Sequence, residues 1–155
     1  FMSKVENISN VQKIDKPWGH EIWLASYYND SKYALKEILI KAPHKSSIQF
    51  HEAKEETNYI QSGTGFLMLS KDPIDIKKFK NDGYSKDDLS IIVSSLESIE
   101  LSKGVVFHIK PGYVHRVIAL TDLLMIEAST LELDDVFRIQ DDSNRGHGKI
   151  DSEHR

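Results

Sequence analysis

Short apolar segments alternate with polar turns along most of this chain. Glycine, proline, asparagine and aspartate interrupt the apolar segments at short intervals, and no helical period of 3.6 residues is sustained over three turns. The segments that this pattern predicts as strands are 33–41, 46–50, 58–60, 66–69, 91–100, 105–109, 114–119 and 123–128. Because these segments are short, closely spaced and not joined by crossover helices, they predict an all-β domain, either a sandwich or a small barrel.

Two stretches depart from the strand pattern. Residues 71–90 are polar and rich in charge, and they predict an insertion loop with a short helix near 74–79. Residues 143–155 are polar and predict a flexible tail, while 1–15 form an N-terminal arm. We therefore expect one domain whose barrel spans 16–142.

Composition narrows the classes of partner. The chain has 155 residues, a formal net charge of -4 and no cysteine, so disulfides and thiolate metal sites are excluded. The mild acidity argues against a nucleic-acid partner, which normally meets a basic surface. No apolar run approaches the roughly 20 residues of a spanning helix, and residues 1–9 lack the apolar stretch of a secretory signal. We expect a cytoplasmic protein without a membrane partner.

Four residues could converge on one metal ion. Gln49 and His51 are two residues apart in a predicted strand, so their side chains share one face. Glu56 begins the next strand and His115 follows a later turn, so a closed sheet could bring both to the same point. Imidazole, carboxylate and amide ligands suit zinc, manganese, iron, nickel or cobalt without choosing among them. Spacing alone is also compatible with a chance occurrence of these residues.

Several short motifs follow one another in a particular order. Lys-Pro-Trp-Gly occupies residues 16–19, Ser-Ile-Gln-Phe-His occupies 47–51 and Ser-Gly-Thr occupies 62–64. Residues 109–116 contain a Pro-Gly turn followed by a histidine, and Asp-Asp-Val-Phe-Arg-Ile-Gln-Asp-Asp occupies 134–142. This order resembles the cupin superfamily. It is similar in particular to type II mannose-6-phosphate isomerases and to the C-terminal cupin domain of mannose-1-phosphate guanylyltransferases. The resemblance covers nearly the whole chain, with 71–90 as its main gap.

The resemblance implies a fold, a ligand set and a partner. The fold would be a single-domain cupin, a jelly-roll barrel also described as a double-stranded β-helix. Gln49, His51, Glu56 and His115 would hold one divalent metal, with zinc as the expected ion and manganese, iron, nickel or cobalt as alternatives. No other cofactor is implied. The substrate would be a small sugar phosphate, and analogy with such cupins suggests a homodimer.

Positions beside these ligands depart from the family pattern. Glu52 and Ala53 stand where the family usually has histidines after the first ligand, and Thr57 and Asn58 replace a His-Trp pair after the glutamate. Because these changes lie beside the metal ligands, they could alter the substrate or remove the activity.

Three further residues are candidates for catalysis of an aldose–ketose isomerisation through an enediol. Glu127 is an unusual polar residue in an apolar strand and is the candidate base, with a solvent-facing strand end as the alternative. Lys36 matches a family lysine and could contact phosphate or assist proton transfer, unless it faces solvent. Arg138 is the preferred phosphate or enediolate contact and Arg116 the second choice, because a guanidinium can bind two oxygens at once.

Two other functions remain open for such a site. A His-Glu-His set also suits an iron dioxygenase, and the changes beside the ligands could indicate a non-catalytic sugar-binding cupin. The remaining histidines are predicted to be incidental or on the surface: His20, His44, His108, His147 and His154.

Overall fold

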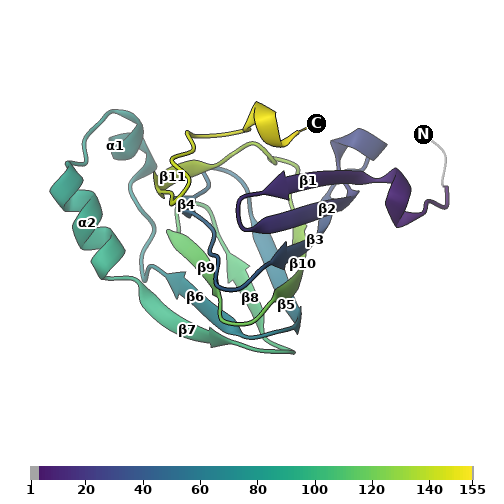
Figure 1. Cartoon of the computed structure of the whole chain (residues 1–155). Helices are drawn as coiled ribbons and strands as arrows, with labels where there is room; N and C mark the ends of the chain where they lie inside the picture. Colours follow the sequence, from purple (N-terminus) through teal and green to yellow (C-terminus); the bar gives the residue numbers. More distant parts are fainter. Residues whose placement is uncertain (1–3, 155) are drawn as a thin grey trace.

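The computed structural model describes residues 4–154, and within that range eleven strands form two antiparallel sheets (Figure 1). The six-stranded sheet has the order β1 (Gln12–Lys16), β2 (Gly19–Ala25), β3 (Ala34–Ile40), β10 (Leu123–Ser129), β5 (Glu56–Ser62) and β8 (Val106–Ile109). The five-stranded sheet has the order β11 (Phe137–Gln140), β4 (Ile48–Phe50), β9 (His115–Ala119), β6 (Gly65–Leu69) and β7 (Glu97–Leu101). From β7 onward each successive strand changes sheet, which is the connectivity of a jelly roll. The predicted all-β, single-domain architecture is confirmed.

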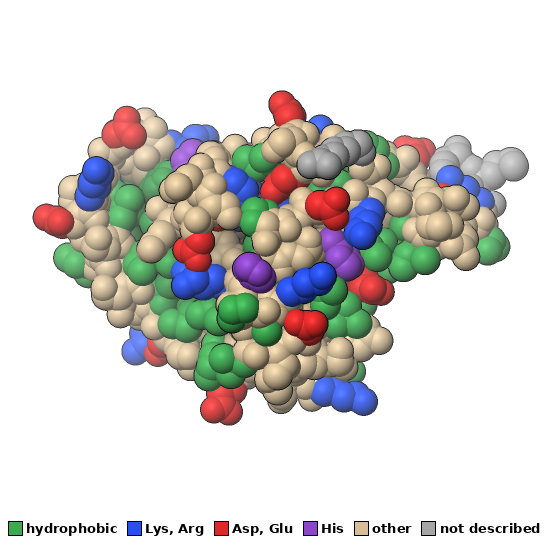
Figure 2. Space-filling view, in the orientation of Figure 1, with side chains coloured by type: hydrophobic (Ala, Val, Ile, Leu, Met, Phe, Trp, Pro, Cys, Tyr) green, Lys and Arg blue, Asp and Glu red, His purple; other side chains and the backbone are tan. Residues whose placement is uncertain are grey.

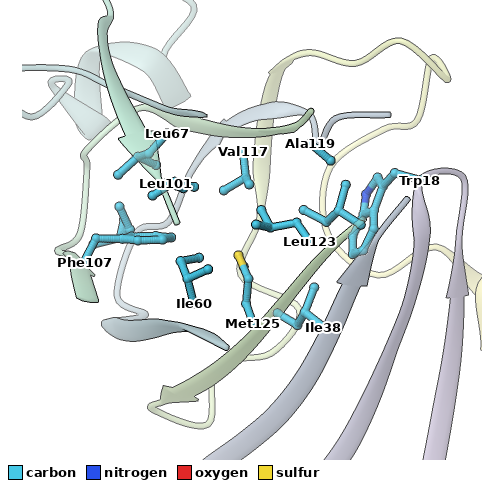
Figure 3. Packing of buried hydrophobic residues seen from close by; sticks show 12 residues of the cluster. Trp18, Ile38, Ile60, Leu67, Leu101, Phe107, Val117, Ala119, Leu123 and Met125 are labelled. Carbon is cyan, nitrogen blue, oxygen red and sulfur yellow. The ribbon is translucent and has the colours of Figure 1, made fainter. Parts of the chain in front are cut away.

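The core lies between the two sheets. In β3 and β10 every second residue is buried, because side chains in a strand alternate between its two faces. Figure 3 shows Ile38, Met125 and Ile60 of the six-stranded sheet facing Leu67 and Val117 of the other sheet. Burial of such side chains supplies the main stabilising free energy of the fold.

Further along the same strands, the inward-facing positions become polar. Lys36 shares a face with Ile38 in β3, and Glu127 shares a face with Met125 in β10. The β-ladder places Lys36 opposite Glu127, and Asn58 of β5 opposite Glu127 from the other side. The space between the sheets is therefore apolar at one end and polar at the other.

The segment predicted as an insertion loop contains two helices, α1 (Ile76–Lys80) and α2 (Lys86–Ser94). The expected strand over 91–100 is wrong in its first half, because residues 91–94 belong to α2 and only Glu97–Leu101 forms a strand. A capping box fixes the start of α2: the Ser85 hydroxyl accepts from the Asp88 backbone N–H, and the Asp88 carboxylate accepts from that of Ser85.

The helical insertion covers the outer face of the five-stranded sheet. Phe79 of α1 packs edge-on against Phe50 of β4, with ring centroids 4.9 Å apart, and Phe50 stacks on Phe137 of β11 at 5.2 Å. Figure 1 shows both helices on the flank of the barrel. Because β4 alternates, its outward Ile48 and Phe50 need this cover, and its remaining residue, Gln49, lines the pocket between the sheets.

Residues near both ends of the chain make contacts with the barrel. β1 begins at Gln12, inside the predicted arm, and pairs with β2. The C-terminal segment lies beside β1 (Figure 1), where Glu153 of the short helix η3 (Asp151–Glu153) bonds Lys16 at 3.0 Å and Arg145 at 3.3 Å. Flexibility of 143–155 stays a prediction, and residues 1–3 and 155 lie outside the described range. Short 3-10 helices also occur at Ile8–Asn10 (η1) and Tyr27–Asn29 (η2).

Charge is mixed on the surface. Figure 2 shows lysine and arginine side chains interspersed with aspartate and glutamate on the face in view. Within residues 4–154, no helix is both long enough and apolar enough to cross a bilayer.

Ile60 tests the packing of the core. It is fully buried, and Ile60→Ala is expected to lower the free energy of unfolding by about 2–5 kcal/mol, because it removes apolar contacts and leaves a cavity. Ile91 is 67% exposed, so Ile91→Ala should change stability by less than about 0.5 kcal/mol. Denaturant unfolding of both variants measures the difference, and equal losses would contradict the assigned core.

Candidate metal centre

Three of the four predicted ligands converge at the polar end of the barrel. His51 follows β4, Glu56 begins β5 and His115 begins β9, and all three side chains are buried. Their ligand atoms lie within 4.8 Å of one another. Glu56 stands between the histidines, with Oε2 at 3.8 Å from His51 Nε2 and Oε1 at 3.6 Å from His115 Nε2.

The histidine rings are oriented by main-chain carbonyl groups. His51 Nδ1 lies 2.6 Å from the Asp135 carbonyl oxygen, and His115 Nδ1 lies 2.9 Å from that of Tyr113. A carbonyl only accepts hydrogen bonds, so each Nδ1 carries the proton and each Nε2 presents a lone pair. His51 Nε2 is buried without a hydrogen-bond partner among residues 4–154. An orphaned buried nitrogen beside a carboxylate fits a metal ligand.

Burial also favours the neutral imidazoles that metal binding requires. It lowers the pKa of His51 to about 3, with a further contribution from the positive charge of Lys54. Burial lowers the pKa of His115 as well. Both rings are therefore neutral near pH 7.

Gln49 lies on the same wall of the barrel but has a partner of its own. It pairs with His115 across the β4–β9 ladder and lines the pocket. Its Oε1 accepts a hydrogen bond from the Ser47 hydroxyl at 2.5 Å. Its role as a fourth ligand stays a prediction.

A row of buried charges continues from Glu56 across the six-stranded sheet. The Lys54 amine lies 2.9 Å from Glu56 Oε2 and 3.3 Å from Glu127 Oε2. The Lys36 amine lies 3.8 Å from Glu127 Oε2 and 3.1 Å from Glu21 Oε1. Glu127 and Lys36 therefore face the interior, and the alternative that each points into solvent does not hold.

The two neighbouring carboxyl groups have opposite pKa shifts. Burial and the nearby charge of Glu56 raise the pKa of Glu127 to about 8. Burial acts on Glu56 in the same direction, but the positive charge of the neighbouring Lys54 ammonium opposes it, and the pKa of Glu56 lies well below the usual value. Near neutral pH Glu56 is ionised and Glu127 largely protonated, a division of roles typical of sites that transfer protons.

Lys54 is a residue of this site that the sequence does not reveal. The Asp135 carboxylate accepts hydrogen bonds from the backbone N–H groups of Glu52, Ala53 and Lys54, at 2.9, 2.7 and 2.9 Å. These bonds fix the loop between β4 and β5 and turn the Lys54 side chain inward. In the sequence Glu-Ala-Lys-Glu-Glu this lysine looks like an exposed loop residue, and no local signal distinguishes it.

The site opens into a pocket between the two sheets. Arg138 lines it and donates from Nη1 to the Gly148 carbonyl at 3.1 Å, while its buried Nε has no partner within residues 4–154. Arg116 does not line it, because its guanidinium bonds the Ser46 carbonyl at 2.7 Å and Asp142 at 3.2 Å.

The C-terminal segment also contributes to the pocket wall. Lys149 and His154 are among its lining residues. The ring of His154 packs against Trp23, 5.5 Å between centroids, so this histidine is not an incidental surface residue. The contact joins residues from the two ends of the chain, and neither sequence neighbourhood reveals it.

Comparisons with known proteins give matches among solved structures alone. No protein-family model matches the sequence, and no curated protein does. A structure of a Streptomyces PAC13 variant with uridine overlaps 90% of this chain and 93% of its own, with a TM-score of 0.63 and 11% identity. Ectoine synthase from P. lautus overlaps 83% and 78%, with a TM-score of 0.61 and 14% identity. Cellulomonas parahominis L-ribose isomerase with L-psicose overlaps 82% and 72%, with a TM-score of 0.61 and 13% identity.

At these identities the likeness establishes the fold. With the two-sheet jelly roll, these similar structures show that the chain has a single-domain fold of the cupin type. A buried His-Glu-His cluster at the polar end of such a barrel could bind a metal ion.

Asp135 tests how the loop positions the cluster. Asp135→Ala leaves three backbone N–H groups without their acceptor, and the free energy of unfolding should fall by about 2 kcal/mol or more. Asp135→Asn keeps one oxygen and should lose less. The matched control is Asp134→Ala, an exposed neighbour, which should change little. Denaturant unfolding distinguishes the three variants, and equal losses for Asp135→Ala and Asp134→Ala would contradict this role of the loop.

Proposed function

We propose that this cupin is a metal-dependent aldose–ketose isomerase acting on a phosphorylated sugar, with mannose 6-phosphate and fructose 6-phosphate as the expected pair. The observation that carries the proposal is the convergence of His51, Glu56 and His115 within 4.8 Å beside a buried carboxyl group whose pKa is raised to about 8. Two neutral imidazoles and one carboxylate fit a divalent ion such as zinc, manganese, iron, nickel or cobalt.

Two independent likenesses support the choice of reaction. The order of motifs from Lys-Pro-Trp-Gly to the Asp-Asp-Val-Phe-Arg segment is similar to that of type II mannose-6-phosphate isomerases. A solved structure with the same fold is an L-ribose isomerase with L-psicose. The cupin fold occurs in proteins with many other activities, so the reaction has to be inferred from the residues of this site.

Isomerisation requires a proton to move between two neighbouring carbon atoms of the sugar. A metal ion bound by the three ligands would polarise the sugar carbonyl and stabilise the negative oxygen that develops there. Glu127, in its ionised form, would remove the proton from C2 and return it to C1, while the hydroxyl proton of O2 passes to O1, so that the aldehyde becomes an alcohol and the alcohol becomes a ketone. Its raised pKa of about 8 makes the carboxylate basic enough for this task near neutral pH.

Other polar groups of the pocket would hold the substrate. Lys36 and Lys54 donate toward the oxygens of the enediolate, since both amines already lie beside Glu127. Asn58 Oδ1 is buried without a partner in the described chain, and it can accept a hydrogen bond from a sugar hydroxyl. Arg138 and Lys149 provide positive charge for the phosphate on the pocket wall.

A coupled assay with mannose 6-phosphate tests the proposed reaction. The protein loaded with zinc, manganese or cobalt should produce fructose 6-phosphate, and chelation should abolish turnover. His51→Ala should lower kcat/KM at least about a hundredfold, because the ion loses a ligand. His44→Ala, an exposed histidine, is the matched control and should retain full activity.

The outcomes separate the proposed isomerase from the other functions. No turnover with any of these ions would contradict the isomerase. Oxygen consumption by the iron-loaded protein would favour a dioxygenase, and binding of the sugar phosphate without turnover would favour a sugar-binding cupin.

Glu127→Gln tests the base. Removal of a general base typically costs about 10²–10⁴-fold in rate, so kcat should fall by this amount while KM changes little. Glu55→Gln is the control, because Glu55 is exposed in the neighbouring loop and pairs with Lys110. A Glu127→Gln variant with wild-type kcat would show that another group moves the proton.

A further inference from the structure

The amine of Lys54 occupies a position that neither the metal ligands nor the proposed base requires. It lies between two buried carboxyl groups, 2.9 Å from Glu56 Oε2 and 3.3 Å from Glu127 Oε2. Its side chain is 5% exposed, although residues on both sides of it in the loop are exposed. A charged amine so completely removed from water must be compensated by the groups around it.

One oxygen of Glu56 is close to both the amine and a histidine. Oε2 lies 2.9 Å from Lys54 Nζ and 3.8 Å from His51 Nε2, while Oε1 lies 3.6 Å from His115 Nε2. An ion bound between the two histidines and Glu56 would therefore lie within a few ångströms of the ammonium. The ammonium and a divalent cation would depend on the same carboxylate.

Two positive charges at such a separation repel each other strongly in a buried site, where water screens them poorly. Lys54 has a second acceptor, Glu127 Oε2, on the side away from the histidines. The ammonium can therefore give up Glu56 and still have an acceptor, and a positive charge at this position favours the ionised form of Glu127.

We propose that Lys54 is a built-in competitor for the metal, which neutralises Glu56 when no ion is bound and shifts onto Glu127 when an ion binds. The inference rests on the metal site proposed above. Lys54 then lowers the affinity of the site for divalent ions and keeps the metal exchangeable. Metal binding also brings its ammonium closer to the proposed base Glu127.

Titration with cobalt and with zinc tests this role. Isothermal titration of the full chain, freed of metal, gives Kd for the wild type and for Lys54→Met, which has a similar length and no charge. Lys54→Met should bind each ion at least about tenfold more tightly, because the competing charge is removed. A merely structural role for Lys54 predicts the opposite sign, since a disturbed site binds metal more weakly.

Two matched variants isolate the position of the charge. Lys36→Met removes a buried amine that also pairs with Glu127 but for which no contact with Glu56 is seen in the described chain, and Kd should change less than about threefold. Lys54→Arg keeps the positive charge and should not tighten metal binding. Circular dichroism establishes that each variant is folded.

Glu127→Gln supplies an independent test if Lys54→Met does not fold. Glutamine cannot ionise to compensate the displaced ammonium, so Lys54 stays on Glu56 and metal binding becomes weaker. In the double variant with Lys54→Met, the effect of Glu127→Gln should largely disappear, because the competitor is absent.

The binding measurements distinguish a failure of the competitor role of Lys54 from a failure of the proposed metal site. Stoichiometric binding by the wild type with equal or weaker binding by Lys54→Met would overturn the competitor and leave the metal site standing. Absence of binding by the wild type, Lys54→Met and Glu127→Gln alike would overturn both. Tight binding by Lys54→Met with weak binding by the wild type is the expected result.

Discussion

An ionised carboxylate inside a protein is costly unless positive charge lies beside it. Glu56 is such a group: it is buried and ionised, its neighbours are two neutral imidazoles, and the ammonium of Lys54 is 2.9 Å away. In the structure, the Lys54 ammonium compensates this negative charge. In the proposed function, a bound metal ion would compensate it. In the proposed account, the ammonium and the metal ion depend on the same carboxylate, and this shared dependence explains much of the pocket.

The jelly roll makes this arrangement possible because each strand contributes to both the core and the site. Ile38 and Lys36 lie on the same face of β3, and Met125 and Glu127 lie on the same face of β10. The apolar members fix the sheets against each other, and that packing holds the polar members at fixed separations. Rigid strands therefore position the charged row, while Asp135 fixes the single loop that contributes His51 and Lys54.

Much of the fold and part of the site follow from the sequence, for reasons that particular residues make clear. Period-two burial in β3 and β10 is visible in the pattern of apolar residues, and so the all-β prediction is confirmed. The strand expected over Ile91 to Val93 is wrong because β-branched residues favour strands locally, whereas the capping box at Ser85 and Asp88 begins a helix there. Alternation does not decide which way Glu127 and Lys36 face, since both faces of a strand are equally regular. Lys54 and His154 escape sequence-based prediction because only tertiary contacts bring them to the pocket.

X-ray absorption at the metal edge of the cobalt-loaded protein tests the central claim most directly, because it reports the atoms that bind the ion and not merely its presence. We predict a stoichiometric ion with two imidazole ligands and oxygen atoms in the remaining positions, and the loss of one imidazole in His51→Ala. An ion whose spectrum contains no imidazole, or one that is unchanged in His51→Ala, would contradict the assignment of this site.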